Sequence, residues 1–107
     1  MAGKIITKQE ALQYNADSLL ADTHKRENNI NIFKETINKE YEAISLDEHM
    51  ISSIDPDHPD VIALKNLIAK KKINIKTFED AIKEEEIQIE RDLEMIKLIN
   101  KNNKSIN

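Results

Sequence analysis

The sequence contains no cysteine, one glycine, two prolines and few aromatic residues. Without cysteine the chain forms neither a disulfide framework nor a thiolate zinc site, which fits a reducing compartment. With so little glycine it has no glycine-rich loop to hold a phosphate group. Aromatic residues make up 4% of the 107 residues, so any core has to be filled by aliphatic side chains.

Charge and hydropathy argue against a nucleic acid or a membrane as the partner. The net charge is −4 at pH 7, whereas a non-specific nucleic-acid binder normally carries a basic excess. No stretch approaches the roughly 20 apolar residues that span a bilayer, and residues 1–6 lack the apolar core of a signal peptide. We therefore expect a cytoplasmic protein. The abundance of Ile, Asn and Lys is typical of low-GC bacteria and their phages, and a phage origin would make a virion-associated location the alternative.

The residues that interrupt helices are confined to the start of the chain and to one segment near its middle. Gly3 lies at the start, and Pro56 and Pro59 lie near the middle. A capping box formed by Thr7 and Glu10 predicts a helix that begins near residue 8. That helix has to end by about residue 54, because a residue before a proline avoids the helical conformation.

A second helix is expected over 59–101. Pro59 suits the first helical position because its missing N–H is not needed there. Asp57 and Asp60 add negative charge, which the N-terminus of a helix favours. The expected organisation is an N-terminal extension over 1–7, a single helical-hairpin domain over 8–101 and a frayed polar tail over 102–107.

Branched aliphatic residues recur every seven residues along both expected helices, and we call these positions a of a heptad abcdefg. They are Ile30, Ile37, Ile44 and Ile51 in the first helix, and Val61, Ile68, Ile75, Ile82, Ile89 and Ile96 in the second. A seven-residue repeat held this long predicts coiled-coil packing. Its phase runs unbroken through 22–24, where Asp22 or Thr23 could start a new helix. One helix over 8–54 is therefore favoured over two helices with a bend near 22–24.

The predicted fold is all-α, a long antiparallel helical hairpin of the coiled-coil kind. The short turn between Ile54 and Val61 forces the helices to run antiparallel, so opposed residues have numbers that add up to about 115. This register places opposite charges beside each other at the flanking e positions, as in Lys34–Glu79 and Glu48–Lys65. Exposed ion pairs of this kind are each worth only a few tenths of a kcal/mol, so they select the pairing more than they stabilise it.

Charged residues occupy several d positions, where a seam between two helices needs apolar side chains. They are Glu40, Asp47, Lys71, Glu85 and Asp92. Long charged side chains can lay their stems on such a seam and keep their heads in water, and we expect that arrangement here. A seam this thin is usually held by a further contact, either with another copy or with a different protein.

One flank of the predicted hairpin, at the g positions, carries no charge apart from Asp22. We name these uncharged g positions and their apolar c neighbours the neutral stripe. Contiguous apolar surface marks contact sites, so the stripe is the expected protein-binding face, and its alternative is that the helices rotate and bury it within the hairpin. The residues expected to bind a partner are Ile32, Ala43, Leu46, Met50, Leu67 and Ala81.

No constellation of side chains indicates catalysis, a cofactor or a metal. The turn holds Asp55, Asp57, His58 and Asp60, but it lacks the glycine and the distal glutamate of a calcium loop, and helix capping explains the acidic residues. His24 and His49 are interpreted as solvated surface residues. The acidic second half has no Glu-x-x-His pair for a di-metal helix bundle. We therefore expect no enzyme, no cofactor and no small-molecule substrate.

The leading hypothesis for function is a non-enzymatic protein–protein interaction module, of the assembly-chaperone, adaptor or inhibitor type. In it the neutral stripe clasps a partner helix or a second copy of the chain, so that a homo-oligomer is expected. The alternative is a structural subunit of a larger repeating assembly. The proline-flanked turn followed by Ala63-Leu64-Lys65-Asn66-Leu67-Ile68 is similar in outline to type III secretion needle subunits. That resemblance covers only the turn and the next two helical turns, the rest of that pattern is lacking, and it assigns no residues.

A third hypothesis is nucleic-acid contact through the lysines of the second helix. They are Lys70, Lys71, Lys72, Lys76 and Lys83. It is disfavoured because the predicted register surrounds these lysines with acidic residues. Salt-sensitive retention of DNA or RNA would be needed to support it.

Overall fold

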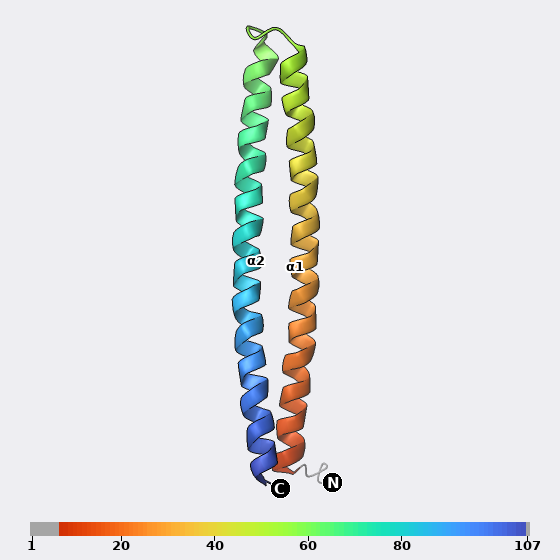
Figure 1. Ribbon diagram of the computed structural model, residues 1–107, viewed down its shortest axis with the longest axis vertical. Coiled ribbons are helices and arrows are strands. Elements are labelled where there is room, and N and C mark those ends of the chain that lie inside the picture. The colour runs from red at the N-terminus through yellow and green to blue at the C-terminus, as the bar shows by residue number, and fades with distance from the viewer. Residues whose placement is uncertain (1–6, 107) are drawn as a thin grey trace, which may run out of the picture. The chain divides into compact units, whose positions relative to one another are not determined.

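The chain forms two long helices joined by a short turn, in a computed structural model that describes residues 7–106 and the side chains as far as residue 102. Helix α1 runs over Lys8–Ser53 and helix α2 over Pro59–Ile106. The chain reverses at the turn, and the two helices run antiparallel (Figure 1). The predicted all-α helical hairpin is confirmed. The extension expected over 1–7 lies outside the described residues except for Thr7.

Helix α1 begins where the capping box predicts. The Glu10 amide donates to Thr7 Oγ1 at 3.0 Å, and the Ala11 amide donates to the Thr7 carbonyl at 3.0 Å. The helix continues without a break through 22–24, so the single-helix prediction is confirmed. Thr23 does not cap a new helix, because its hydroxyl donates to the Leu19 carbonyl one turn back, at 3.0 Å.

Helix α2 begins at Pro59, as expected, but its cap is a histidine. The Asp60 amide donates to His58 Nδ1 at 3.1 Å, and the Val61 amide donates to the His58 carbonyl at 3.0 Å. The imidazole therefore satisfies an amide that α2 cannot satisfy itself. The helix ends at Ile106, past the expected end at about residue 101, because neither glycine nor proline follows to stop it. The fraying expected over 102–107 stays a prediction.

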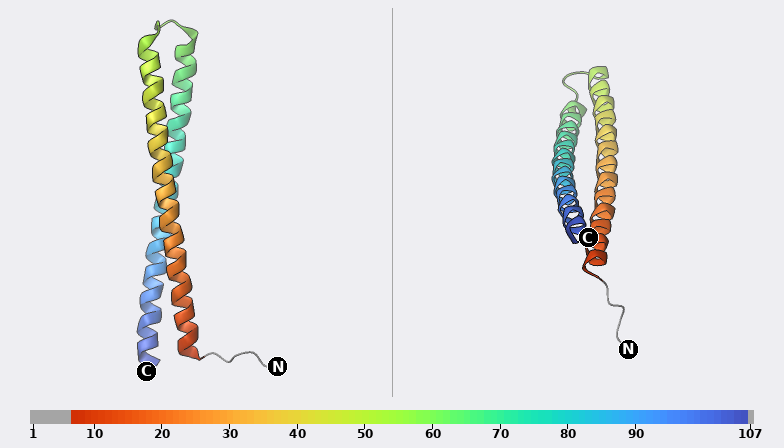
Figure 2. Two further views of the ribbon diagram at one scale, coloured as in Figure 1. Left: turned by 90° about the vertical axis from the view of Figure 1, so that its right-hand side faces the viewer. Right: turned by 60° about the horizontal axis from the view of Figure 1, so that its bottom comes forward.

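The chain divides into two compact units. We call Ile30–Lys83 the turn unit, and Met1–Asn29 with Glu84–Asn107 the terminal unit. In the turn unit α1 and α2 lie side by side (Figures 1 and 2) and enclose a cluster of buried isoleucines at a positions. Ile44, Ile68 and Ile75 form its centre, and Ile37 and Ile51 pack against them.

The terminal unit has a smaller apolar core. Its buried hydrophobic residues are Ala16 and Ile99, and the polar Thr23 is buried at an a position between them and the boundary of the unit. Neither helix, over the residues that the structure describes, has a stretch long and apolar enough to cross a membrane.

Contacts across the seam agree with the predicted register. Asp47 contacts Lys71, and the rings of Phe33 and Phe78 have centroids 5.8 Å apart. Each pair joins d positions and lies within about one helical turn of the register in which opposed numbers add up to about 115.

The ion pairs expected at e positions are wrong. Among the residues that the structure describes, neither Lys34–Glu79 nor Glu48–Lys65 forms an ion pair, and all four residues are exposed. The flanks at e are turned toward solvent, where long side chains stay hydrated, and the ion pairs that cross the seam form at d positions instead.

Candidate protein-binding face and charged seam

The six residues predicted to bind a partner all lie in the turn unit, and the four large ones are exposed. Leu46 is 66% exposed, Ile32 59%, Met50 53% and Leu67 45%. Ile32, Leu46 and Met50 follow the helical spacing that puts them on one side of α1. The unit leaves a large part of each of these residues uncovered, so this apolar surface is available to another molecule.

The two small predicted residues, Ala43 and Ala81, are half-buried beside the seam, and so is Thr36. The residues at e positions of the same unit, such as Lys34 and Tyr41, are all exposed. The g flank therefore lies closer to the partner helix than the e flank does. The alternative prediction, burial of the stripe within the hairpin, describes the alanines but not the large side chains.

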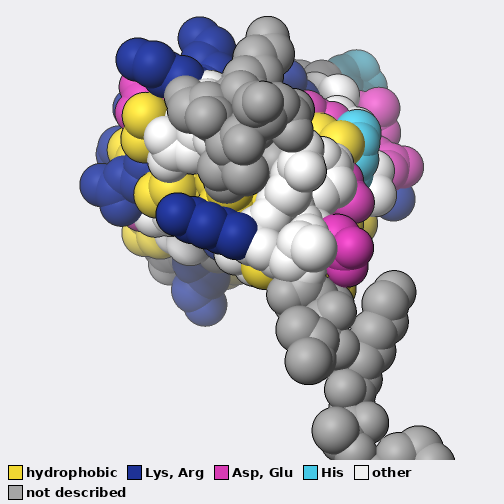
Figure 3. Space-filling view, turned by 90° about the horizontal axis from the view of Figure 1, so that it is seen from below, with side chains coloured by type: hydrophobic (Ala, Val, Ile, Leu, Met, Phe, Trp, Pro, Cys, Tyr) yellow, Lys and Arg dark blue, Asp and Glu magenta, His cyan; other side chains and the backbone are white. Residues whose placement is uncertain are grey.

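Exposed hydrophobic residues also occur outside the predicted set. Those with large side chains are Tyr14, Leu20, Tyr41, Ile62, Ile73, Ile87, Leu93, Met95 and Leu98. In the view from below, hydrophobic side chains reach the surface between lysine and arginine side chains (Figure 3). Met95 and Leu98 occupy g and c positions of α2, which are the heptad positions from which the predicted binding residues come.

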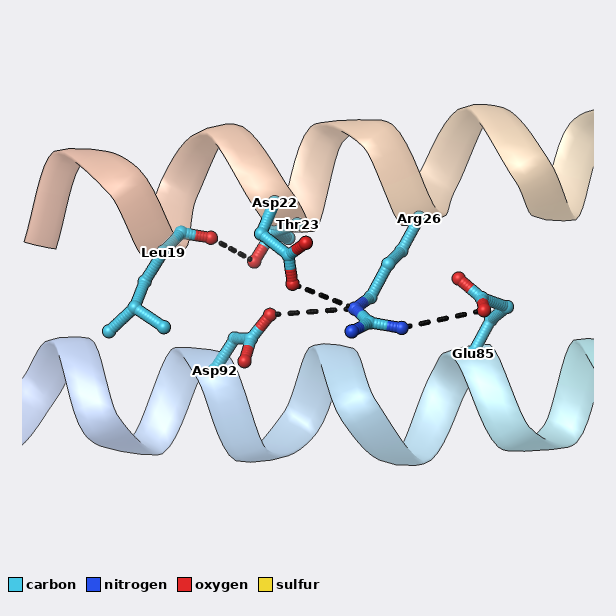
Figure 4. Close-up of polar contacts among 6 residues, drawn as sticks. All are labelled: Leu19, Asp22, Thr23, Arg26, Glu85 and Asp92. Carbon is cyan, nitrogen blue, oxygen red and sulfur yellow. Dashed lines mark hydrogen bonds and ion pairs between the residues drawn. The ribbon is translucent and has the colours of Figure 1, made fainter.

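In the terminal unit a single arginine of α1 binds three carboxylates at the seam (Figure 4). Arg26 Nε lies 2.8 Å from Asp22 Oδ2, and Nη1 lies 3.4 Å from Glu85 Oε1. The Nε atom is also 3.7 Å from Asp92 Oδ2, which is too long for a hydrogen bond. The predicted register already brings the acidic residues 84–86 of α2 near Arg26, but it predicts neither the ion pair with Asp92 nor the sharing of one arginine among three carboxylates.

The pKa values of Asp22 and Asp92 shift in opposite directions, although Arg26 lowers both. The hydrogen bond from Arg26 lowers the pKa of Asp22, and a hydrogen bond with Asp92 lowers it further. Burial raises the pKa of Asp92, and the neighbouring Asp22 carboxylate adds to the rise. The negative form of Asp92 is thus disfavoured by burial and by the neighbouring Asp22 carboxylate, and Arg26 offsets only part of this.

In the turn unit the charged seam has one ion pair. Lys71 on α2 donates to Asp47 on α1, and Asp47 is buried. Two turns away on α1, Glu40 Oε2 is buried without a hydrogen-bond partner. The prediction that charged d positions keep their heads in water is wrong for Asp47, because the cation on the opposite helix reaches it across the seam. The same contact engages the central lysine of the Lys70–Lys72 run, which a nucleic acid would need.

The residues described by the structure contain no group of three or more possible metal ligands and no pocket. His24 is exposed and lies 3.6 Å from Glu27 on its own helix. His58 is engaged in capping. The described residues present surfaces along two helices that carry ion pairs and exposed apolar side chains.

Comparison with known proteins adds no relative. No family model matches the chain, and neither a curated protein nor a solved structure is significantly similar to it. The neutral stripe, with the charged seam behind it, is therefore the feature of the molecule that indicates a function.

Proposed function

We propose that this protein is a non-enzymatic interaction module that binds a helical protein surface through the neutral stripe of its turn unit. One observation carries the proposal: Ile32, Leu46, Met50 and Leu67 expose large aliphatic side chains along a flank whose g positions are uncharged. Burial of such surface is the main favourable term in protein association. An assembly chaperone, an adaptor or an inhibitor in the cytoplasm would use a face of this kind.

The neutral stripe combines large exposed side chains with small half-buried ones. The large side chains project from α1 and α2, and the small residues Ala43 and Ala81 lie at the edge of the seam. A partner helix can approach closely over small residues while its flanks contact the large ones. Aliphatic contacts recognise an apolar stripe on the partner, and the rim lysines Lys39 and Lys70 favour acidic residues beside that stripe.

A second candidate is a structural subunit of a repeating assembly. Open assemblies need two different faces on each subunit, because each copy contacts its neighbours through surfaces that do not match themselves. Ile73 is 65% exposed at an f position of α2, away from both the seam and the stripe. Filaments or rings that form with rising concentration in negative stain would favour this candidate, and a complex of defined size would favour the first.

The test uses the double variant Leu46→Lys with Met50→Lys in the full chain. Two ammonium groups on the stripe have to be desolvated on binding, so association should be lost. Helicity by circular dichroism should be retained, because both side chains are exposed. The measurement combines the mass of the isolated protein in solution with a pull-down from the native host.

The matched control is the double variant Tyr41→Lys with Ile62→Lys. Both residues are exposed and apolar in the same unit, but they lie at e and b positions on the other flank. This control should bind as the unmodified chain does. The proposal fails if the two double variants lose association equally, or if neither does.

A further inference from the structure

The two helices repeat one sequence. Segment 28–54 of α1 and the turn aligns with segment 73–99 of α2 without a gap. The identical pairs are Asn29/Asn74, Ile30/Ile75, Phe33/Phe78, Ile37/Ile82, Glu40/Glu85, Ile44/Ile89, Asp47/Asp92, Met50/Met95, Ile51/Ile96 and Ile54/Ile99. Isoleucine at every a position follows from coiled-coil packing alone. The order Phe, Glu, Asp, Ile at successive d positions does not, because two of these residues are charged.

Equivalent residues make equivalent contacts. Phe33 packs on Phe78, which is its own counterpart. In the terminal unit Arg26 of α1 meets Glu85 and Asp92 of α2. In the turn unit Lys71, the counterpart of Arg26, meets Asp47, the counterpart of Asp92, with the roles of the helices exchanged. The hairpin is therefore an antiparallel pair of like helices, and the seam surface of this helix is complementary to itself.

The repeat also shows which flank is constrained. Over 28–54 and 73–99 every a and d residue is identical, and identity outside them occurs only at g, in Asn29/Asn74 and Met50/Met95. The other g positions in the alignment change but stay uncharged. No e position is retained, and Lys34 even becomes Glu79. A two-helix seam needs only a and d, whereas a, d and one flank together are the pattern of a helix in a larger bundle.

We infer that the molecule docked on the neutral stripe is a second copy of this chain, so that two hairpins form a four-helix bundle. This inference rests on the proposed function of the stripe and names its partner. A second copy presents the same uncharged flank, so no like charges meet at g when the face contacts itself. The chain already pairs two like helices at its seam, and the second copy extends that pairing to the g side.

The distribution of side-chain size along the stripe fits a two-fold contact. Along α2 the exposed Leu67 lies seven residues before Asn74, and the half-buried Ala81 lies seven residues after it. When a second copy is placed antiparallel with the two-fold axis at Asn74, Leu67 of each copy meets Ala81 of the other. Alternation of large and small residues across facing positions fills an interface without cavities. The centre of this contact is therefore Asn74 of α2, which is exposed.

The first test is the mass of the full chain by sedimentation equilibrium. The expected mass is twice 12.4 kDa, and it should fall to that of a single chain for Leu46→Lys with Met50→Lys but not for Tyr41→Lys with Ile62→Lys. Two desolvated lysines should raise the dissociation constant at least about 100-fold. A dimer that survives in the Leu46 and Met50 variant would overturn both this inference and the proposed function of the stripe.

The second test uses the absence of native cysteine and does not depend on the stability of the lysine variants. Asn74→Cys places a thiol at the predicted two-fold centre, and under mild oxidation it should give a disulfide between copies. Lys72→Cys, an exposed e position of the same helix, is the control and should stay unlinked. Equal cross-linking of both variants would overturn the two-fold contact.

A third outcome separates this inference from the proposed function. If the unmodified chain is monomeric at about 100 µM, far above the dissociation constants of stable complexes, the second-copy inference is overturned. The proposed function would then survive only if the unmodified chain and the Tyr41 and Ile62 variant retain a different host protein that the Leu46 and Met50 variant loses.

Discussion

The turn unit and the terminal unit are built from the same two helices, yet among the described residues the turn unit has more buried hydrophobic side chains. The buried hydrophobic residues of the turn unit are Ile30, Ile44, Val61, Leu64, Ile68, Ile75 and Ile82. Those of the terminal unit are Ala16 and Ile99, with Thr23 at an a position. Hydrophobic stabilisation grows with the area removed from water. We therefore expect backbone amides of the terminal unit to exchange with solvent faster than those of the turn unit.

The charged seams of the two units also differ. Lys71 has one carboxylate partner in the turn unit, whereas Arg26 is shared among three carboxylates in the terminal unit. A guanidinium has five donors in a planar fork and can serve several acceptors, which an ammonium does less well. The comparison teaches that the same repeat gives a closed ion pair in one unit and an excess of negative charge in the other.

The largest expected difference between the units concerns the apolar core. Ile75→Ala should lower the free energy of unfolding by about 3 kcal/mol, because it removes a side chain at the centre of the isoleucine cluster and leaves a cavity. Ile99→Ala should cost roughly half as much, because the terminal unit packs less around it. Urea unfolding followed by circular dichroism measures both. Equal losses would show that the units are equally well packed.

The charged seams should respond in opposite directions to loss of a carboxylate. Asp47→Asn should destabilise the protein by about 1–2 kcal/mol, because Lys71 loses its partner at a partly buried site. Asp92→Asn should not destabilise it, because Arg26 keeps Asp22 and Glu85 and an unfavourable buried charge is removed. The midpoints of urea unfolding at pH 7 compare the two. Equal destabilisation by both variants would contradict the assignment of excess charge to the terminal unit.

The pH dependence of stability should single out Asp92. A carboxyl whose pKa is raised in the folded state stabilises that state below its ordinary pKa of 3.8, and this contribution is lost as pH rises through the raised value. Asp92→Asn cannot lose stability in this way. The free energy of unfolding of the variant, relative to that of the unmodified chain, should therefore rise from pH 3.5 to pH 6, a range that brackets the shift. Asp22, whose pKa is lowered, contributes with the opposite sign, so Asp22→Asn should lose stability relative to the unmodified chain as pH rises over the same range.

A smaller effect is expected when the polar a position of the terminal unit is made apolar. Thr23→Val keeps the shape of the side chain and replaces the hydroxyl that donates to the Leu19 carbonyl. The Leu19 carbonyl is also an acceptor in the backbone hydrogen bonds of the helix, so the loss of the Thr23 hydroxyl costs little. The apolar contact of the valine outweighs that cost, and stability should rise by about 0.5–1 kcal/mol. Hydrogen exchange should slow in the terminal unit and stay unchanged in the turn unit. Slower exchange in both would mean that the units unfold together.

The smallest difference concerns the two caps. His58→Ala removes the acceptor for the Asp60 amide and should cost about 0.5–1 kcal/mol. Thr7→Ala removes the acceptor for the Glu10 amide and should have a similar or smaller effect, because we expect the terminal unit to open before the turn unit. Thermal unfolding of the single variants gives the comparison. His58→Asn, which retains a side-chain acceptor, should restore most of the loss and serves as the control.

Much of the fold followed from sequence periodicity. The heptads of isoleucine predicted two long helices, and the prolines predicted the turn between them, since Pro59 can only begin a helix. The capping box at Thr7 placed the start of α1. His58 was missed because its capping role depends on a side-chain nitrogen that meets an amide two residues later, a geometry that ordinary capping preferences do not favour. The end of α2 was placed too early because a polar composition weakens a helix without stopping it.

The candidate site was less predictable than the fold. Heptad position alone selected the neutral stripe, but it could not separate Ala43 and Ala81, which the partner helix half covers, from Leu46 and Met50, which it leaves exposed. Heptad position alone predicts that the charged residues at d positions keep their charged groups in water. Whether a charged side chain at the seam is solvated or paired depends on whether an opposite charge on the other helix lies within reach. The distance between the two charged groups is set by the packing of the helices.

By itself the sequence determined the helices, their turn and their antiparallel register, because these depend on local propensity and on a repeat that one chain carries along its length. Only the tertiary structure decided the burial of Asp47 beside Lys71, the sharing of Arg26 among three carboxylates and the exposure of the large residues of the neutral stripe. These depend on distances of a few ångströms between side chains of different helices. A periodic pattern specifies which residues face each other, and packing specifies which of them touch.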